Sequence, residues 1–317
     1  MIERTHGERV LVTGGAGFLG SHLVDRLVEE GLEVRVLDNL QAGSLENLAG
    51  VRHRIDLRTG DLRDPAAVDA AVSGCSVVFH LGANASVPAS VEDRGYDFAT
   101  NAGGTFHVAD AAVRHGVRRI VFASSAAVYG PPRTIPVAES HPLLPISPYG
   151  GSKVAAERML YAYARTFGFE LAILRIFNTY GPRQRRYVAY DLMQKLARDR
   201  RRLEVLGDGE QRRDYCFVSD TVAAFRLASL HPLDGGEPAV WNVSGGRTIS
   251  IRELVGLILR TLAIEGTEVV YGLPSWKGDI DVLSGDVAAL RSTGWEPKVS
   301  MEEGLRRLAA DLGWKPA

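Results

Sequence analysis

The chain has 317 residues, of which 45% are hydrophobic and 24% charged, an ordinary composition for a folded globular protein. Its 37 basic and 38 acidic side chains leave a net charge of −1, which gives no support for nucleic-acid or membrane-surface binding through bulk charge. Cys75 and Cys216 are far apart and the eight histidines show no ligand spacing, so we expect neither a disulfide framework nor a metal site. The apolar runs are strand-sized and the first ten residues lack an apolar core. We therefore expect no membrane span, no signal peptide and a cytoplasmic location.

The first half of the chain alternates short apolar runs with helical patterns. The runs predict strands at residues 9–13, 33–38, 54–58, 76–81, 118–124 and 170–177. The helical patterns lie at residues 18–30, 96–115 and 148–167. Strand–helix alternation with strands that are apolar on both faces predicts a doubly wound parallel (Rossmann) α/β sheet.

After about residue 176 the pattern changes. We expect helices at residues 187–198, 219–230 and 250–262, and strands at residues 203–206 and 240–243. This half predicts a smaller α/β lobe over residues 176–317 that closes over the carboxyl edge of the first domain, residues 1–175, with some segments returning to that domain. The run RDRRR at 198–202 is interpreted as a solvated helix end rather than a basic patch.

Three glycines, Gly14, Gly17 and Gly20, lie between the first predicted strand and the first predicted helix. Such spacing provides a tight turn, a backbone that can approach a pyrophosphate, and close packing of helix on strand. The free N–H groups at the start of the helix then face the phosphates. Because the strand and the helix flank the glycines, the segment predicts a dinucleotide site rather than a purely structural turn.

Asp38 ends the second predicted strand, 18 residues after Gly20. A carboxylate there can accept hydrogen bonds from the adenosine ribose hydroxyls and would repel a 2′-phosphate, so it predicts NAD rather than NADP. The alternative is a turn aspartate before Asn39. Asp61 and Leu62 follow the third strand and are placed to meet the adenine, although alone they would be an ordinary turn.

Tyr149 and Lys153 lie four residues apart at the start of a predicted helix and therefore project from one face. A free tyrosine has a pKa of about 10, too high for a base at neutral pH. A lysine ammonium one turn away and a positive nicotinamide ring would both favour the phenolate. Ser125, at the end of the preceding strand, can share the hydrogen bond to a substrate hydroxyl.

These segments, taken in order, resemble the extended short-chain dehydrogenase/reductase family, specifically its nucleotide-sugar epimerase/dehydratase branch. The motifs that carry the resemblance are TGGAGFLG (13–20), LDN (37–39), GDL (60–62), HLGANASV (80–87), NAGGT (101–105), ASSAAVYG (123–130), YGGSK (149–153), RIFNTYGPRQ (175–184) and RRDYCFVSD (212–220). The resemblance covers essentially the whole chain. It implies a bound NAD, a nucleoside-diphosphate sugar as substrate, most often a UDP-sugar, and usually a homodimer built on a four-helix contact.

The resemblance also implies roles for individual residues. Tyr149 would be the base, Lys153 would orient it and bind the nicotinamide ribose, and Ser125, which stands four residues before Tyr129, would bridge the sugar hydroxyl in preference to Ser124. The expected cofactor-binding residues are Gly14, Gly17, Phe18, Leu19, Asp38, Asn39, Asp61, Leu62, Leu81, Ala83, Asn101, Tyr149, Lys153 and Ile176. The expected substrate-binding residues are Ser86, Ser125, Asn178, Arg185, Arg213 and Asp279. Without the resemblance, Asn178 would be a turn or capping residue and Arg213 a surface arginine.

The choice of reaction depends on groups beyond this set. In the family pattern, a 4,6-dehydratase has an acidic pair directly after the catalytic Ser/Thr, but this chain has Ala126 and Ala127 there. Cys75 precedes a buried strand and is interpreted as a core thiol rather than an extra acid or base. The set present fits 4-epimerisation, in which C4 of the sugar is oxidised to a 4-keto intermediate and reduced again on its other face.

The sugar itself stays open at this point. Arg185 lies in the run RQRR at 183–186, where a guanidinium could pair with a carboxylate. Some UDP-glucuronate 4-epimerases resemble this stretch, which favours a uronic acid. Arginines that bind only phosphate or solvent are the alternative, so both UDP-glucuronate and UDP-glucose are candidates. UDP-glucuronate decarboxylation is a second candidate reaction. A non-catalytic NAD-binding regulator is a remote one, because its expected mark is a broken Ser/Tyr/Lys set.

One late segment departs from the family pattern. The family's RxGD-type stretch has an arginine two residues before the glycine, and here Trp276 occupies that place before Lys277 and Gly278. Lys277 could supply the charge, or Trp276 could pack on the nucleoside. The base therefore stays open between uridine and thymidine.

Overall fold

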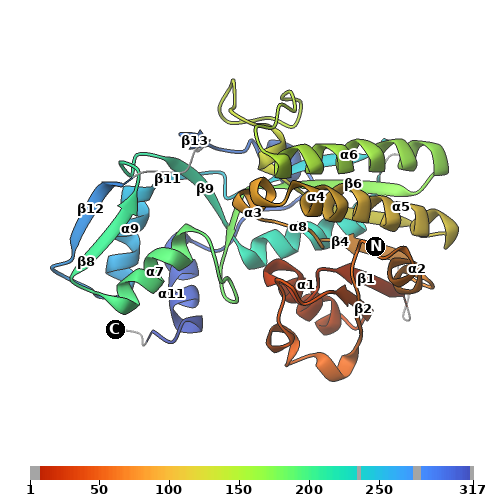
Figure 1. Ribbon diagram of the computed structural model, residues 1–317, viewed down its shortest axis with the longest axis horizontal. Helices are drawn as coiled ribbons and strands as arrows, with labels where there is room; N and C mark the ends of the chain where they lie inside the picture. The colour runs from red at the N-terminus through yellow and green to blue at the C-terminus, as the bar shows by residue number, and fades with distance from the viewer. Residues whose placement is uncertain (1–7, 234–236, 274–279, 315–317) are drawn as a thin grey trace. The chain divides into compact units, whose positions relative to one another are not determined.

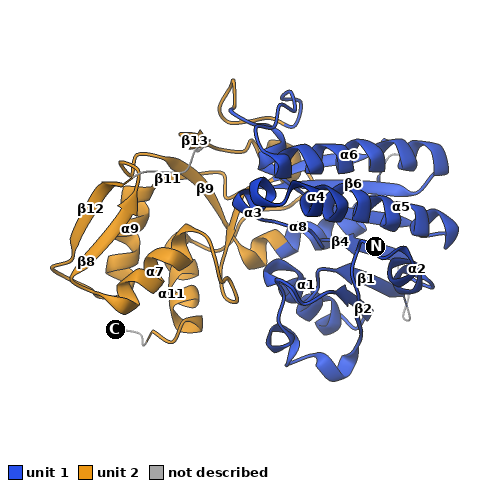
Figure 2. Ribbon diagram, viewed as in Figure 1, with its two compact units in different colours: residues 1–131, 139–176, 222–242 blue, residues 132–138, 177–221, 243–317 orange. Residues whose placement is uncertain are grey.

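The computed structural model describes residues 8–233, 237–273 and 280–314, which form two compact units. Unit 1 comprises residues 1–131, 139–176 and 222–242, and unit 2 comprises residues 132–138, 177–221 and 243–317 (Figure 2). None of the helices within the described residues is long and apolar enough to cross a membrane.

Unit 1 is built on a seven-stranded sheet of order β10-β6-β5-β4-β1-β2-β3. Figure 1 labels its strands β1, β2, β4 and β6. The strands are β1 (Arg9–Thr13), β2 (Glu33–Asp38), β3 (Ile55–Thr59), β4 (Val77–His80), β5 (Arg119–Ser125), β6 (Glu170–Ile176) and β10 (Ala239–Val243). Strands β1 to β6 pair in parallel throughout. Their order is that of a doubly wound Rossmann sheet, so the predicted fold class is confirmed.

Helices cover both faces of this sheet. They are α1 (Phe18–Glu29), α2 (Pro65–Val72), α3 (Val87–Glu92), α4 (Arg94–Phe98), α5 (Gly104–Arg114), α6 (Pro148–Phe167) and α8 (Val218–Leu230), with the turns η1 (Leu45–Leu48), η2 (Arg52–Arg54), η3 (Ala99–Gly103) and η4 (Ala126–Val128). One apolar cluster joins the inner sides of α2, α5 and α6 to alternate residues of the strands, among them Leu11, Val78 and Ile120. Because successive strand residues point to opposite faces, Val10 and Val12 belong to the other face.

The long helix expected at residues 96–115 is not continuous. It is divided into α4 and α5 by η3, a π-helical turn that contains Thr100, Asn101 and Ala102. A π turn inserts one extra residue per turn, which a 3.6-residue hydrophobic pattern does not reveal, and such turns are frequent at functional sites.

The strand expected at residues 240–243 forms, but as β10 it belongs to the seven-stranded sheet, where it lies next to β6. Helix α8, expected in the second lobe, has its residues from Val222 onward in unit 1. Arg119 on β5 donates to the carbonyl oxygen of Ala228 in that helix at 3.0 Å.

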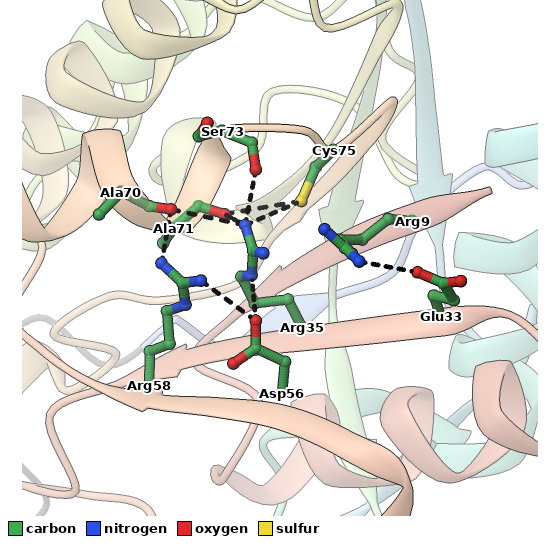
Figure 3. Close-up of polar contacts among 9 residues, drawn as sticks. All are labelled: Arg9, Glu33, Arg35, Asp56, Arg58, Ala70, Ala71, Ser73 and Cys75. Atoms are coloured by element: carbon green, nitrogen blue, oxygen red, sulfur yellow. Dashed lines mark hydrogen bonds and ion pairs between the residues drawn. The ribbon is translucent and has the colours of Figure 1, made fainter. Parts of the chain in front are cut away.

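A buried arginine ties β2 to the end of helix α2 (Figure 3). The Arg35 guanidinium donates to Asp56 at 2.6 Å and to the carbonyl oxygens of Ala71 and Ser73 at 2.9 and 2.7 Å. These carbonyls lie at the negative end of the helix, where a cation is stabilising. Cys75 lies against the same guanidinium and donates to Ala71, as a core thiol does. Burial raises the pKa of this thiol.

Unit 2 is a smaller α/β unit with two sheets. Its strands are β7 (Asn178–Tyr180), β8 (Arg202–Leu206), β9 (Arg212–Phe217), β11 (Thr248–Ser250), β12 (Glu268–Leu273) and β13 (Val282–Leu283). Its helices are α7 (Val188–Arg198), α9 (Ile251–Thr261), α10 (Ala288–Arg291) and α11 (Met301–Asp311). Strand β9 pairs with β11, β13 and β7, and β12 pairs with β8. The short strands β7, β11 and β13 carry too few residues for a periodic signal.

Candidate active site

The glycine-rich turn after β1 closes tightly because two of its residues lack a side chain. Gly14 has φ of +69°, and a Cβ there would lie 2.8 Å from Gly82 in the loop after β4. A Cβ on Gly20 would lie 2.1 Å from the Gly14 carbonyl oxygen, so α1 can pack this closely only with glycine at that position. The turn is therefore specified by backbone conformation and by steric contact together.

Helix α1 begins directly after this turn with its first N–H groups uncapped by any side chain. Its N-cap is Gly17, which has no side-chain acceptor, and the first turn, with Phe18 and Leu19, carries no acidic residue. A helix start of this kind presents N–H donors and a positive dipole end to an anion.

Asp38 ends β2 at the same edge of the sheet. It is 6% exposed and accepts hydrogen bonds from the N–H groups of Ala16 at 2.9 Å and Leu40 at 2.8 Å. Burial raises the pKa of Asp38, while the two backbone donors favour its carboxylate. The donors fix the carboxylate beside the glycine turn.

Asn39 and Asp61 lie together at the ends of β2 and β3. The Asn39 amide donates to Asp61 at 2.9 Å, and the Arg63 guanidinium donates to both carboxylate oxygens at 2.9 Å. These contacts hold the pKa of Asp61 well below its usual range. Leu62, the next residue, is buried, and a Cβ on Gly82 or Gly104 would lie only 2.8 or 2.7 Å from its side chain.

Tyr149 occupies the first turn of α6, which begins as the sequence dictates. Ser147 caps the helix by accepting from Gly150, and Pro148 takes the first position. The N–H of Tyr149 donates to the hydroxyl of Ser90 in α3 at 3.1 Å. The absence of a side chain at Gly150 lets α6 approach the carbonyl oxygen of Ala127, because a Cβ there would lie 2.5 Å away.

The two serines at the end of β5 have different surroundings. Ser124 is 3% exposed and its hydroxyl donates to Glu157 at 2.5 Å. Ser125 is half-buried, caps the turn η4 by accepting from Ala127 at 3.2 Å, and is the register partner of Ile176 on β6. The Ser124 hydroxyl therefore donates its hydrogen bond within the protein. Within the described residues, the Ser125 hydroxyl only accepts from Ala127, so its proton can be donated to a substrate.

Lys153 follows Tyr149 by one turn of α6 and is 3% exposed. Its ammonium lies 4.5 Å from the centroid of the Phe122 ring. Burial lowers the pKa of Lys153 to about 8, against the opposing effect of the carboxylates of Glu157 and Asp97. At neutral pH the side chain is mostly the ammonium form.

Asn101, in the π turn, is the centre of a buried hydrogen-bond network. It accepts from the N–H of Asn84 at 2.8 Å, and its amide donates to Asp97 and to Ser152, both at 3.0 Å. Ser152 in turn donates to Asp97 at 2.7 Å. The network holds the loop after β4, which carries Ala83, against the first turns of α6.

A second chain of contacts starts at His80, the last residue of β4. Its ring bonds the hydroxyls of Thr13 at 2.7 Å and Thr105 at 3.0 Å. Complete burial lowers the pKa of His80 to about 3, so the ring is neutral at physiological pH. Leu81, the next residue, donates to the carbonyl of Thr13 at 3.2 Å, which joins the loop after β4 to the glycine turn.

The expected substrate residues have defined surroundings within their own units. Ser86 caps α3 by accepting from Ala89. In unit 2, Asn178 donates to the carbonyl of Asp214 at 3.3 Å. Arg213 donates to the carbonyls of Arg212 at 2.9 Å and Asp281 at 3.4 Å.

The Arg185 side chain forms an ion pair within unit 2. Its guanidinium pairs with Asp311 of α11 at 2.8 Å, and the same carboxylate oxygen accepts from the N–H of Arg183 at 3.0 Å. Asp279 lies outside the described residues, as do Trp276 and Lys277. Among the residues that are described, no grouping of three His, Cys, Asp or Glu side chains is suited to a metal ion.

Several residues that organise this site were not singled out in the sequence. They are Ser90, Asp97, Ser152 and Glu157. Ser152 lies inside the YGGSK motif and Glu157 follows Lys153 by one turn, so their helix face could have been predicted from spacing. Ser90 and Asp97 carry no such signal, because the fold alone brings their segments to α6.

Comparison with known proteins decides the family. The model of the NAD dependent epimerase/dehydratase family matches residues 10–244. The chain belongs to this family.

Individual members of the family are similar over nearly the whole length. A UDP-glucose 4-epimerase from Mycolicibacterium smegmatis is 37% identical over 314 residues, covering 94% of this chain and 96% of the relative. The solved UDP-glucose 4-epimerase of Thermotoga maritima with UDP-glucose has a TM-score of 0.89 at 34% identity, covering 96% and 98% of the two chains. That of Thermus thermophilus in complex with NAD has a TM-score of 0.85 at 36% identity, covering 96% and 99%.

The residues at the sheet edge fit the family's dinucleotide. The turn has glycine at positions 14 and 20, so backbone rather than side chains faces the place of a pyrophosphate. The uncapped N-terminus of α1 supplies the donors, and the buried Asp38 carboxylate supplies an acceptor for ribose hydroxyls.

Proposed function

We propose that this protein is an NAD-dependent UDP-sugar 4-epimerase that acts on UDP-glucose or UDP-glucuronate. The observation that carries the proposal is the arrangement of Tyr149 and a buried Lys153 on α6 against the turn that follows Ser125. Ala126 and Ala127 form that turn, so it offers no carboxylate for a dehydration. The names and bound molecules of the similar proteins support the same activity.

The residues proposed to hold NAD follow the edge of the unit 1 sheet. Gly14, Gly17, Phe18 and Leu19 would hold the pyrophosphate, Asp38 and Asn39 the adenosine ribose, and Asp61 and Leu62 the adenine, while Leu81, Ala83, Asn101, Lys153 and Ile176 would line the remainder. When bound, NAD would supply the hydride acceptor for oxidation at C4 of the sugar and the hydride donor for reduction on the opposite face. Asp38 would favour NAD over NADP because its carboxylate would repel a 2′-phosphate.

The protein's own part in the reaction is to move one proton and to orient the sugar. The Lys153 ammonium favours the phenolate of Tyr149, which removes the proton of the C4 hydroxyl and later returns it. The Ser125 hydroxyl donates to the same sugar oxygen. The neighbouring Ser124 hydroxyl is held by Glu157 and takes no part in this step.

The residues proposed for the rest of the substrate are Ser86, Asn178, Arg213, Arg185 and Asp279. Asn178 and Arg213 would hold the diphosphate. Arg185 would meet the sugar's C5 substituent only after leaving Asp311, so its ion pair lowers the gain from binding a uronate carboxylate. This contact favours UDP-glucose over UDP-glucuronate as the better substrate.

We propose in addition a homodimer in the cytoplasm, formed through helices α4, α5 and α6. Phe98, Phe106, Tyr161 and Phe167 are exposed large hydrophobic residues on these helices. Exposed apolar side chains on helices that pack against one another are typical of an interaction surface. Sedimentation equilibrium would show a monomer if the surface has another role.

Proton NMR with mass detection tests the activity on UDP-glucose and on UDP-glucuronate, each with the pure protein and NAD. An isobaric product with the opposite C4 configuration would confirm the epimerase, and loss of carbon dioxide from the uronate would identify a decarboxylase. Tyr149→Phe is expected to abolish turnover. Tyr163→Phe, on the same helix but outside the residues proposed for the active site and the dimer surface, is the matched control and should leave the rate unchanged. Near-normal turnover by Tyr149→Phe would refute the mechanism.

A further inference from the structure

A buried ion pair joins the catalytic helix α6 to β6, and its two charges have no part in the mechanism above. Glu157 is 3% exposed and accepts from Arg175 on β6 twice, at 3.0 Å from Nε and 2.8 Å from Nη2. Its third donor is the Ser124 hydroxyl, at 2.5 Å. The Arg175 guanidinium also donates to the Tyr129 hydroxyl at 3.0 Å and to the carbonyl of Glu139 at 2.8 Å. Three donors from two strands thus fix one carboxylate on α6.

This carboxylate lies one helical turn beyond Lys153, on the same face of α6. Among the residues that the structure describes, Lys153 has no hydrogen-bond partner, and its ammonium lies against the ring of Phe122. The charged groups that act on it are Glu157 from its own helix and Asp97 from α4, and the neutral His80 is nearby on β4. A buried ammonium without hydrogen bonds depends on such fixed charges to remain protonated.

The two carboxylates are held differently. Asp97 is fixed by neutral donors, the Ser152 hydroxyl and the amides of Asn84 and Asn101. Glu157 is held by a guanidinium, which stabilises its charge more strongly than neutral donors do. These two charge-assisted bonds fix the position of the Glu157 carboxylate one helical turn from Lys153.

We propose that Glu157 is a positioning residue for the Tyr149–Lys153 pair: its carboxylate, fixed by Arg175 and Ser124, keeps Lys153 in the ammonium form and holds the end of β5 against α6. The proposal deepens the proposed function and rests on it for the consequence in catalysis. The effect on Lys153 itself requires no substrate and can be measured separately.

The test is an NMR titration of Lys153 in the cofactor-free protein with ¹³C-labelled lysine. The chain has only five lysines, and Lys153→Arg assigns the signal. Glu157→Gln is expected to lower the pKa of Lys153 by about one unit, because it removes a negative charge and leaves the Arg175 cation nearby. Ser124→Ala, the matched comparison, removes one of the three donors to Glu157 but no charge, and should lower the Lys153 pKa by much less than Glu157→Gln does.

The opposite substitution separates an electrostatic role from a structural one. Arg175→Gln leaves the Glu157 charge without its cation, and is expected to raise the pKa of Lys153. If either single variant does not fold, the double variant Glu157→Gln with Arg175→Gln contains no unpaired charge, and is expected to lower the Lys153 pKa by less than Glu157→Gln does. A wild-type titration of Lys153 in folded Glu157→Gln or in the double variant would overturn the proposal.

The pH profile of kcat then tests the consequence for catalysis. Activity requires the Lys153 ammonium, so the alkaline limb should move to lower pH in Glu157→Gln and to higher pH in Arg175→Gln. A shifted titration with no epimerase activity in the unaltered protein would refute the proposed function and leave the role of Glu157 in place. A shifted titration with an unmoved kcat profile would overturn the catalytic part of the inference.

Discussion

Gly150 follows Tyr149 directly in α6, and its missing side chain determines how closely the helix approaches the turn after Ser125. A Cβ at this position would lie 2.5 Å from the carbonyl oxygen of Ala127 and 2.8 Å from Cβ of Pro145. Gly151 offers a matched comparison, since a Cβ there would meet nothing within 4 Å. Gly150→Ala and Gly151→Ala therefore make the same chemical change in the same helix with opposite steric results.

The magnitude follows from these contacts. Real Cβ atoms essentially never approach closer than 3.0 Å, so Gly150→Ala must separate α6 from the turn by at least 0.5 Å, the difference between 3.0 and 2.5 Å. Overpacking of this kind costs about 1–3 kcal/mol, and the gain in helix propensity offsets about 0.5–1 kcal/mol. A displacement of 1 Å in a catalytic group can lower a rate about 100-fold, so we expect kcat to fall about tenfold.

The assay is a coupled measurement of 4-epimerisation together with thermal unfolding of each variant. Gly150→Ala should lower both kcat and the melting temperature. Gly151→Ala should keep the wild-type kcat and melt slightly higher, because alanine stabilises a helix by about 0.5–1 kcal/mol relative to glycine. Wild-type kcat and stability in Gly150→Ala would refute the reasoning that the close contact positions Tyr149 against Ser125.

Three further predictions concern stability and cofactor choice. Arg35→Met removes the bonds to Asp56 and to the end of α2, and should lower the free energy of unfolding by about 2–3 kcal/mol in urea denaturation. Because the folded pKa of His80, about 3, lies below its unfolded value of 6.5, stability is present above pH 6.5 and is lost as the pH falls. Between pH 7 and 4.5 this group should lower the free energy of unfolding by about 2–3 kcal/mol. His80→Gln should not show this decrease. Asp38→Asn should decrease the preference for NAD over NADP at least about tenfold in equilibrium binding.

Each of these predictions has its own control. Arg58 also contacts Asp56, at 3.3 Å, and donates to the carbonyl oxygen of Ala70 at 2.7 Å, but its side chain is 37% exposed, so Arg58→Met should change stability by less than about 1 kcal/mol (Figure 3). Equal effects of the Arg35 and Arg58 substitutions would contradict the role of burial. If the stability of His80→Gln falls with pH as in the unaltered protein, other groups control the acid dependence. If Asp38→Asn keeps the same preference for NAD over NADP, Asp38 does not discriminate between the two cofactors.

Local pattern was sufficient for much of the fold. The strands at residues 9–13, 33–38 and 170–177 and the helix at 148–167 were predicted to within a residue or so, because burial on both faces gives continuous apolar runs and an amphipathic helix repeats every 3.6 residues. The π turn in residues 96–115 and the position of β10 were not predicted. A π turn leaves no periodic trace, and the neighbour of an edge strand depends on the path of the whole chain.

The same division holds for the candidate site. Sequence by itself determined the glycine turn, Asp38 at a strand end and the common helix face of Tyr149 and Lys153, since each depends on residues a few positions apart. Only the tertiary structure decided that Ser124 donates to Glu157 while Ser125 stays at the end of β5, and that Arg185 pairs with Asp311. Ser124 and Glu157 are 33 residues apart and Arg185 and Asp311 are 126 apart, so strand register and helix packing, rather than local spacing, bring them together.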